Sequence, residues 1–208
     1  LRVVPIHVPP LRERRDDLVA IIEATKPTVL IGTTGTPGMF DRQVVEAMAR
    51  HAQRPMIFPL SNPTDLAEGK PAEIVPWSGG RALVATGSPF DPVVHEGRTL
   101  VVSQANNAYV FPGLGLGVLV AQAREVTDAM FTVAAKALAE LVTPDDLARG
   151  ALLPPVNDLR RVSRAVAVAV AQEALDSGLA RRPLDREDVV TAVDDAMWFP
   201  DYPVYEPA

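Results

Sequence analysis

The stretch Pro55-Met56-Ile57-Phe58-Pro59-Leu60-Ser61-Asn62-Pro63-Thr64 decides the fold of this chain. An apolar run of strand length ends abruptly at a small polar cluster. Because Pro63 disfavours the helical conformation for Asn62, the chain is expected to turn there. In an open α/β sheet, ligands bind just beyond the carboxyl ends of the strands. The Asn62 amide is therefore placed where it can meet a ligand, although an Asn before Pro is also ordinary turn chemistry.

The same pattern occurs on both sides of this stretch. Thr28–Ile31 runs into the loop Gly32–Gly38, and Ala82–Thr86 runs into Gly87–Phe90. These runs are too short for helices and rich in strand-forming residues. The amphipathic segment Asp41–Ala52 separates the first two, and connections of this length indicate parallel βαβ units. The sequence therefore predicts an α/β fold with a Rossmann-like parallel sheet, a partial doubly wound one, that brings three loops to one edge.

The remainder of the chain is predicted to be mainly helical. Helices are expected at Arg12–Thr25, Ala108–Ala123, Val126–Leu141, Asn157–Asp176 and Asp185–Ala196. Asp91–Arg98 is expected to be a surface excursion. The segment Ala108–Ala123 is apolar almost throughout, which indicates burial on all sides, and Phe131 is expected to face inward. We expect a sheet domain over 1–142 and a C-terminal helical extension and tail over 143–208 that packs on it.

The composition excludes several classes of protein. With 208 residues, a net charge of −6 and a pI near 5.1, the chain has no basic excess for nucleic acid or an anionic membrane as its main partner. It has no cysteine, so it has no disulfide and no thiolate zinc site. Its apolar stretches fall short of the roughly 18 residues that suggest a membrane span. We expect a cytoplasmic protein.

Two further features are candidates for ligand binding. Backbone amides of the loop Gly32–Gly38 could cradle an anion or a ribose, but a tight turn also needs glycine, and neither GxGxxG nor a P-loop lysine is present. Asn106 and Asn107 supply uncharged donors that can hold a carboxylate or a carboxamide, or they cap a helix. The histidines lie in unrelated contexts, so the residues reveal no general base.

Five motifs, in this order and spacing, together resemble malic enzymes. They are Pro27–Gly32, Gly35–Phe40, Pro59–Thr64, Ala85–Phe90 and Gln104–Gly117. The resemblance runs from about Leu18 to about Trp198, and the residues of the motifs are similar to those of the bacterial, NAD-linked branch. Malolactic enzymes are relatives that share Gln104–Asn107 in nearly this form.

The resemblance implies NAD-dependent oxidative decarboxylation of L-malate to pyruvate and CO2, with Mn or Mg acting as a Lewis acid. It implies that Asn62, Asn106 and Asn107 bind the substrate. It also implies that the cofactor is bound by Gly32, Thr33, Thr34, Asn62, Gly87 and Ser88. NADP is possible in place of NAD, because no residue in this chain discriminates between them. Family members are dimers or tetramers, so a homo-oligomer is expected.

The resemblance assigns no catalytic residue and no metal ligand to this chain. The family's Tyr and Lys catalytic residues, its Glu-Asp-Asp metal ligands and its GxGxxG turn lie upstream of what the sequence contains. We therefore expect the chain to supply only the cofactor-domain wall of the site and to be inactive alone. Two alternatives stay open: a malolactic enzyme, which converts malate to lactate, and a non-catalytic nucleotide-binding or assembly module.

Overall fold

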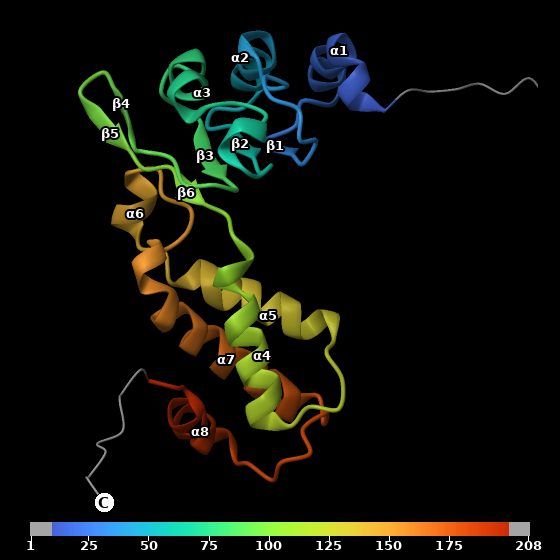
Figure 1. The fold of residues 1–208 in the computed structure, drawn as a ribbon, viewed down its shortest axis with the longest axis vertical. Helices are drawn as coiled ribbons and strands as arrows, with labels where there is room; N and C mark the ends of the chain where they lie inside the picture. The colour runs from blue at the N-terminus through green and yellow to red at the C-terminus, as the bar shows by residue number, and fades with distance from the viewer. Residues whose placement is uncertain (1–9, 200–208) are drawn as a thin grey trace, which may run out of the picture. The chain divides into compact units, whose positions relative to one another are not determined.

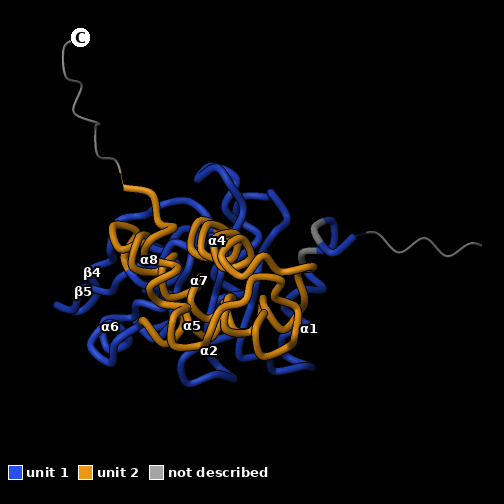
Figure 2. Tube along the Cα trace, turned by 90° about the horizontal axis from the view of Figure 1, so that it is seen from below, with its two compact units in different colours: residues 1–106, 142–154 blue, residues 107–141, 155–208 orange. Residues whose placement is uncertain are grey.

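The computed structural model describes residues 10–199, except for the side chains of Arg12 and Arg15, so the predicted tail after residue 199 lies outside the described residues. The chain forms two compact units (Figure 2): residues 1–106 with 142–154, and residues 107–141 with 155–208. This grouping differs from the predicted domains 1–142 and 143–208, which stay a prediction. Each unit is described by itself.

The first unit is built on a four-stranded sheet in the order β1-β2-β3-β6 (Figure 1). The strands are β1 (Val29–Gly32), β2 (Met56–Pro59), β3 (Leu83–Thr86) and β6 (Ser103–Gln104). All neighbours are parallel, with Leu30 opposite Ile57 and Ile57 opposite Val84. The predicted parallel α/β sheet is confirmed. Since the strands run in one direction, the loops that follow them meet at one edge.

Three helices cover one face of this sheet (Figure 1). They are α1 (Arg15–Thr25), α2 (Arg42–His51) and α3 (Pro71–Trp77). Because strand side chains alternate between faces, Ile57 and Val84 point into the helix layer and are at most 2% exposed. On the opposite face Ile31 of the edge strand is 58% exposed. The core of this unit therefore lies on one side of the sheet.

The segment Asp91–Arg98, expected to be a surface excursion, is largely exposed and is part of an ordered hairpin. It contains β4 (Val93–His95) and leads into β5 (Arg98–Leu100), and the two strands pair antiparallel. The two turn residues, Glu96 and Gly97, have φ values of 47° and 74°, as a two-residue hairpin turn that matches strand twist requires. The first residue of β4 and the last of β5 are buried, which anchors the hairpin to the core.

The second unit is helical. It contains α4 (Phe111–Ala121), α5 (Asp128–Glu140), α7 (Leu159–Asp176) and α8 (Val189–Ala196), whereas the short α6 (Pro144–Ala148) belongs to the first unit. Single 3-10 turns lie at Leu11–Glu13, Thr64–Leu66, Asn107–Tyr109, Val156–Asp158 and Arg186–Asp188. Helix α7 is central to this unit and buries residues at three- and four-residue spacing, among them Val162, Val166 and Val170. Within residues 10–199, no helix combines the length and the apolar character needed to span a bilayer.

The prediction that the segment around α4 is buried on all sides is wrong. Phe111 and Leu119 are 73% and 75% exposed, because α4 packs along one side only. The prediction that Phe131 faces inward is also wrong, since it is 52% exposed on α5. Apolar composition indicated burial here, but it did not indicate which side has a neighbour.

The buried side of α4 approaches α7 through glycine. A Cβ atom added at Gly117 would lie 2.6 Å from the Ala167 carbonyl oxygen and 2.8 Å from Cβ of Val170. Gly113 makes the equivalent approach one helical turn earlier, whereas a Cβ at Gly115 would meet nothing within 4 Å. The two helices are therefore in backbone contact at Gly113 and Gly117.

We expect Gly117→Ala to lower the free energy of unfolding by about 1–3 kcal/mol, because the methyl group overpacks a backbone contact. Gly115→Ala is the matched control on the same helix. It should raise the free energy of unfolding by up to about 1 kcal/mol, since alanine is the better helix former and has space. Urea denaturation of both variants measures the two effects. Equal effects of the same sign would contradict the packing.

Candidate functional site

The candidate site is the edge where the parallel strands end. The loop after β1 carries Gly32, Thr33 and Thr34, and the loop after β2 carries Ser61 and Asn62. The loop after β3 begins with Gly87-Ser88, and Asn106 follows β6. The Asn62–Pro63 peptide bond is cis. The structure thus brings the loops predicted after the first three strands to one edge and adds a fourth.

A buried carboxylate, Glu68, joins the first two loops. Its Oε1 accepts hydrogen bonds from the backbone nitrogen and the hydroxyl of Thr34, at 2.6 and 2.9 Å. The Ser61 hydroxyl donates to the same oxygen at 2.5 Å and itself accepts from the Gly35 nitrogen at 2.9 Å. Ser61 N donates to Oε2 at 3.3 Å. Glu68 is 0% exposed, so these donors take the place of water around it.

The donors also set the charge state of Glu68. Burial raises the pKa of this carboxyl group, whereas the hydrogen bonds donated by Ser61 and Thr34 lower it. The net result is a pKa below its ordinary value of 4.5. Hydrogen bonds to the charged form favour that form. Glu68 is therefore ionised at neutral pH, and its charge is stabilised by hydrogen bonds from uncharged donors on two loops.

Gly32 makes room for this carboxylate. A Cβ at this position would lie 2.7 Å from Cγ of Glu68 and 2.7 Å from Cζ of Phe40. Gly32 is buried, whereas Thr33 and Thr34 are exposed. The structure therefore gives Gly32 a packing role, and its predicted contact with a cofactor stays a prediction.

Asn62 and Ser88 join the second and third loops. The Ser88 hydroxyl donates to Oδ1 of Asn62 at 2.5 Å, and the Thr86 hydroxyl holds the carbonyl of Ser88 at 2.8 Å. A Cβ on Gly87 would come within 2.1 Å of the Leu60 carbonyl oxygen and 2.9 Å of the Asn62 amide. Only glycine permits this approach. Asn62 itself is exposed, so its Nδ2 group can still donate to a ligand.

The fourth loop is joined to the third at β6. Nε2 of Gln104 donates to the Gly87 carbonyl oxygen at 3.3 Å, and Ala105 N donates to the Thr86 carbonyl oxygen at 2.8 Å. Asn106 follows directly and is exposed. Asn107 is also exposed but begins a 3-10 turn in the second unit. The structure thus places Asn106 in the loop after β6, and substrate binding by both asparagines stays a prediction.

The exposed groups at this edge are neutral hydrogen-bonding groups: a carboxamide, hydroxyls and backbone amides. Such a set suits a carboxamide or a carboxylate as ligand. Within residues 10–199, no three His, Cys, Asp or Glu side chains gather closely enough to hold a metal ion.

Sequence reasoning missed Glu68, although it holds two of the predicted loops. It is 34 residues from Thr34 in the chain, and no spacing pattern links them. The signal in the sequence was an acidic residue between two small residues, Ala67 and Gly69. The structure shows that both neighbours are buried. A charge in such a setting needs partners. His51, by contrast, is paired with Glu23 at 2.5 Å, outside this edge.

Glu68→Gln should lower the free energy of unfolding at neutral pH by about 1–3 kcal/mol, because an amide NH2 group faces donors that need an acceptor. The folded-state pKa is lowered, so the stabilisation is complete above the ordinary value of 4.5 and is lost as the pH falls through the lower folded-state value. Denaturation curves of the wild type and the variant should therefore converge in that acidic range. Glu46→Gln, on the exposed side of α2, is the control. A constant difference at all pH values would contradict the assignment.

Comparison with known proteins gives one consistent result. The family described as “Malic enzyme, NAD binding domain” matches residues 8–175. The NAD-dependent malic enzyme of Vibrio parahaemolyticus is 49% identical over 189 residues, which cover 91% of this chain and 34% of the relative. NAD-dependent malic enzyme 3 of Bacillus subtilis is 48% identical over 191 residues, which cover 92% and 33%. The chain spans about a third of the length of these curated relatives.

Solved structures similar in fold to this chain are also malic enzymes. The crystal structure of Entamoeba histolytica malic enzyme superposes with a TM-score of 0.67 at 25% identity, covering 86% of this chain and 34% of that one. Malic enzyme from Pyrococcus horikoshii gives 0.63 at 30% identity, covering 81% and 35%. With a family match over most of its length and this fold, the chain belongs to the malic enzyme family, in the part described as its NAD-binding domain.

Proposed function

We propose that this chain supplies the NAD-binding wall of an NAD-dependent malic enzyme, which converts L-malate to pyruvate and CO2. The observation that carries the proposal is the Asn62 carboxamide at the carboxyl edge of a parallel sheet, with Oδ1 held by Ser88 at 2.5 Å. Ligands of open α/β folds bind at this edge. The two curated relatives named above are NAD-dependent malic enzymes, which favours NAD over NADP.

The residues of this chain act by binding and orienting. Because the Ser88 hydroxyl occupies Oδ1 of Asn62, Nδ2 donates to the ligand, either the nicotinamide carboxamide or a malate carboxylate. Thr33, Thr34 and the Gly87-Ser88 turn hold the nicotinamide end of the cofactor. A bound NAD would supply the hydride acceptor for C2 of malate. The buried Glu68 anion takes no part in the chemistry, since its acceptor atoms are engaged by Thr34 and Ser61.

The remaining parts of the proposal concern the substrate, the metal ion, the compartment and the oligomeric state. Asn106 and Asn107 bind malate through their amides, and the divalent cation, Mn or Mg, is held by residues outside this chain. The protein is cytoplasmic and forms a homo-oligomer. The exposure of Phe111, Leu119 and Trp198, each at least 73%, supports an interface, because large apolar side chains left in water favour association.

The first test is an NAD titration of this chain followed by thermal unfolding. A ligand that binds the folded state raises the melting temperature by mass action, so we expect a saturable increase. Asn62→Ala should weaken the apparent affinity about tenfold or more, since a hydrogen bond from a ligand-facing amide is lost. Asn157→Ala, at an exposed asparagine of the second unit, is the matched control. The absence of any increase at millimolar NAD would favour a purely structural module.

The second test is catalysis by this chain alone. With L-malate, NAD and Mn, we expect neither NAD reduction nor the formation of pyruvate or lactate, because the family's catalytic acid, base and metal ligands are not among these residues. Absorbance of NADH and product analysis measure this together. Steady turnover would refute the assignment of the chemistry to another part of the enzyme, and lactate as the product would favour the malolactic relative.

A further inference from the structure

A cavity lies in the first unit, away from the edge described above. Its volume is about 240 Å³, and its walls include Arg54, Leu83, Arg98, Leu100 and Gly150. Leu83 is the first residue of β3, and Arg54 precedes β2. The cavity is therefore at the amino ends of the parallel strands, whereas the candidate NAD site is at their carboxyl ends.

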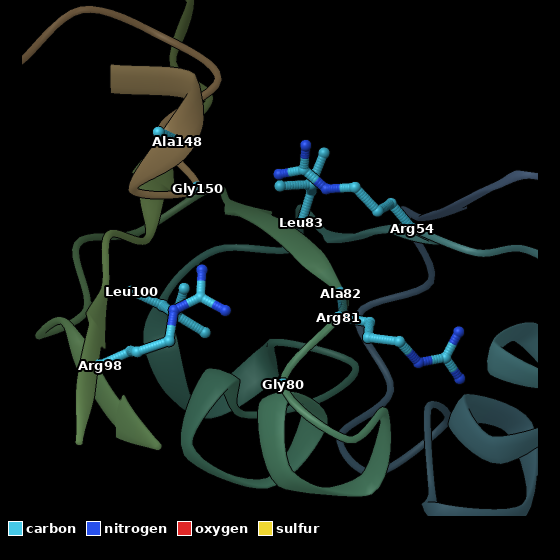
Figure 3. Close-up of a pocket in the computed structure, with 9 residues that line it drawn as sticks. All are labelled: Arg54, Gly80, Arg81, Ala82, Leu83, Arg98, Leu100, Ala148 and Gly150. Atoms are coloured by element: carbon cyan, nitrogen blue, oxygen red, sulfur yellow. The ribbon is translucent and has the colours of Figure 1, made fainter. Parts of the chain in front are cut away.

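Two arginines direct their guanidinium groups toward this cavity from different elements (Figure 3). Arg54 approaches from the segment before β2, and Arg98 approaches from β5 of the hairpin. Arg81 also lines the cavity, but its guanidinium points away in the same view. It donates to three carbonyl oxygens at the end of α2, those of Ala49, Ala52 and Gln53, at 2.7, 3.1 and 3.0 Å.

Arg54 and Arg98 lack such partners within the described part of the chain. The Arg98 guanidinium makes no ion pair with any described carboxylate, and Arg54 makes a single long hydrogen bond, 3.4 Å, to the Leu147 carbonyl oxygen. The residues that line the cavity include no Asp and no Glu. In a chain of net charge −6, this local excess of cationic groups is not a consequence of composition.

The rest of the cavity strengthens the attraction of an anion. Leu83 and Leu100 give it an apolar wall, and Leu100 is only 9% exposed. Electrostatic interactions beside apolar walls are less screened than interactions in open water. A guanidinium presents parallel N–H groups that match the two oxygens of a carboxylate or phosphate. A small anion between Arg54 and Arg98 would therefore satisfy both side chains at once.

We propose that this cavity is a binding site for a small anion, a phosphate or carboxylate group, held between Arg54 and Arg98 and distinct from the NAD site. The volume accommodates one such group with a short carbon chain. Because the cavity and the candidate NAD site are at opposite ends of the strands, both can be occupied together. The proposal does not depend on the proposed function.

The test is isothermal titration calorimetry of this chain with inorganic phosphate and, separately, with succinate, at constant ionic strength. We expect saturable binding of at least one anion, and the preferred one identifies the chemistry of the ligand. Arg98→Gln and Arg54→Gln should each weaken that binding about ten- to a hundredfold, as expected for the loss of a charged hydrogen-bonding partner. Arg42→Gln, which makes the same charge change at an exposed ion pair on α2, should leave it unchanged.

Circular dichroism without the anion checks that the variants fold. If Arg98→Gln does not fold, Arg98→Lys takes its place, because lysine keeps the charge but lacks the planar guanidinium group. The titrations are repeated at saturating NAD. Binding that persists supports a separate site, whereas binding that NAD abolishes would assign the anion to the cofactor site and overturn the proposal. No saturable binding of either anion, or equal weakening in all three glutamine variants, would also overturn it.

Discussion

The buried carboxylate of Glu68 is the interaction on which the candidate site depends. A fully buried charge is costly unless hydrogen-bond donors replace its water, and here the donors come from Thr34 and Ser61 on two different loops. If either loop moved away, the charge would lose part of its solvation. The cost of an unsatisfied Glu68 therefore holds the two loops in one arrangement, and Gly32 is required because any side chain there would collide with the carboxylate.

The same edge is extended by weaker, neutral contacts. The hydroxyl of Ser88 orients Asn62, and Gln104 holds the turn at Gly87. Each contact joins a loop to the next one across the sheet, in the order of the strands. A parallel sheet makes this possible, because it delivers successive loops to one edge at the spacing of neighbouring strands. The resulting surface has its charge buried and its neutral donors exposed, which fits a role in orienting ligands.

The secondary structure of the sheet unit was predictable because it rests on local patterns. The runs around Ile57 and Val84 are strands, as their length and composition indicated, and the amphipathic segment between the first two strands forms α2. The predictions that failed concerned partners. The apolar helix α4 exposes Phe111 and Leu119 because only its glycine-bearing side meets α7. Hydrophobic content does not encode how many neighbours a helix has.

The sequence by itself determined how the first three strands and the main helices follow one another along the chain, where the loops after those strands lie, and the similarity to malic enzymes. Hydrophobic periodicity and the Gly and Pro residues that end helices and strands act over a few residues, so they can be recognised in the sequence alone. Only the tertiary structure decided that Glu68 meets Thr34 across 34 residues of chain and that Ser88 meets Asn62 across 26. It also decided that Arg54 and Arg98 share a cavity. These pairings depend on strand order, register and the packing of loops, which are properties of the whole sheet.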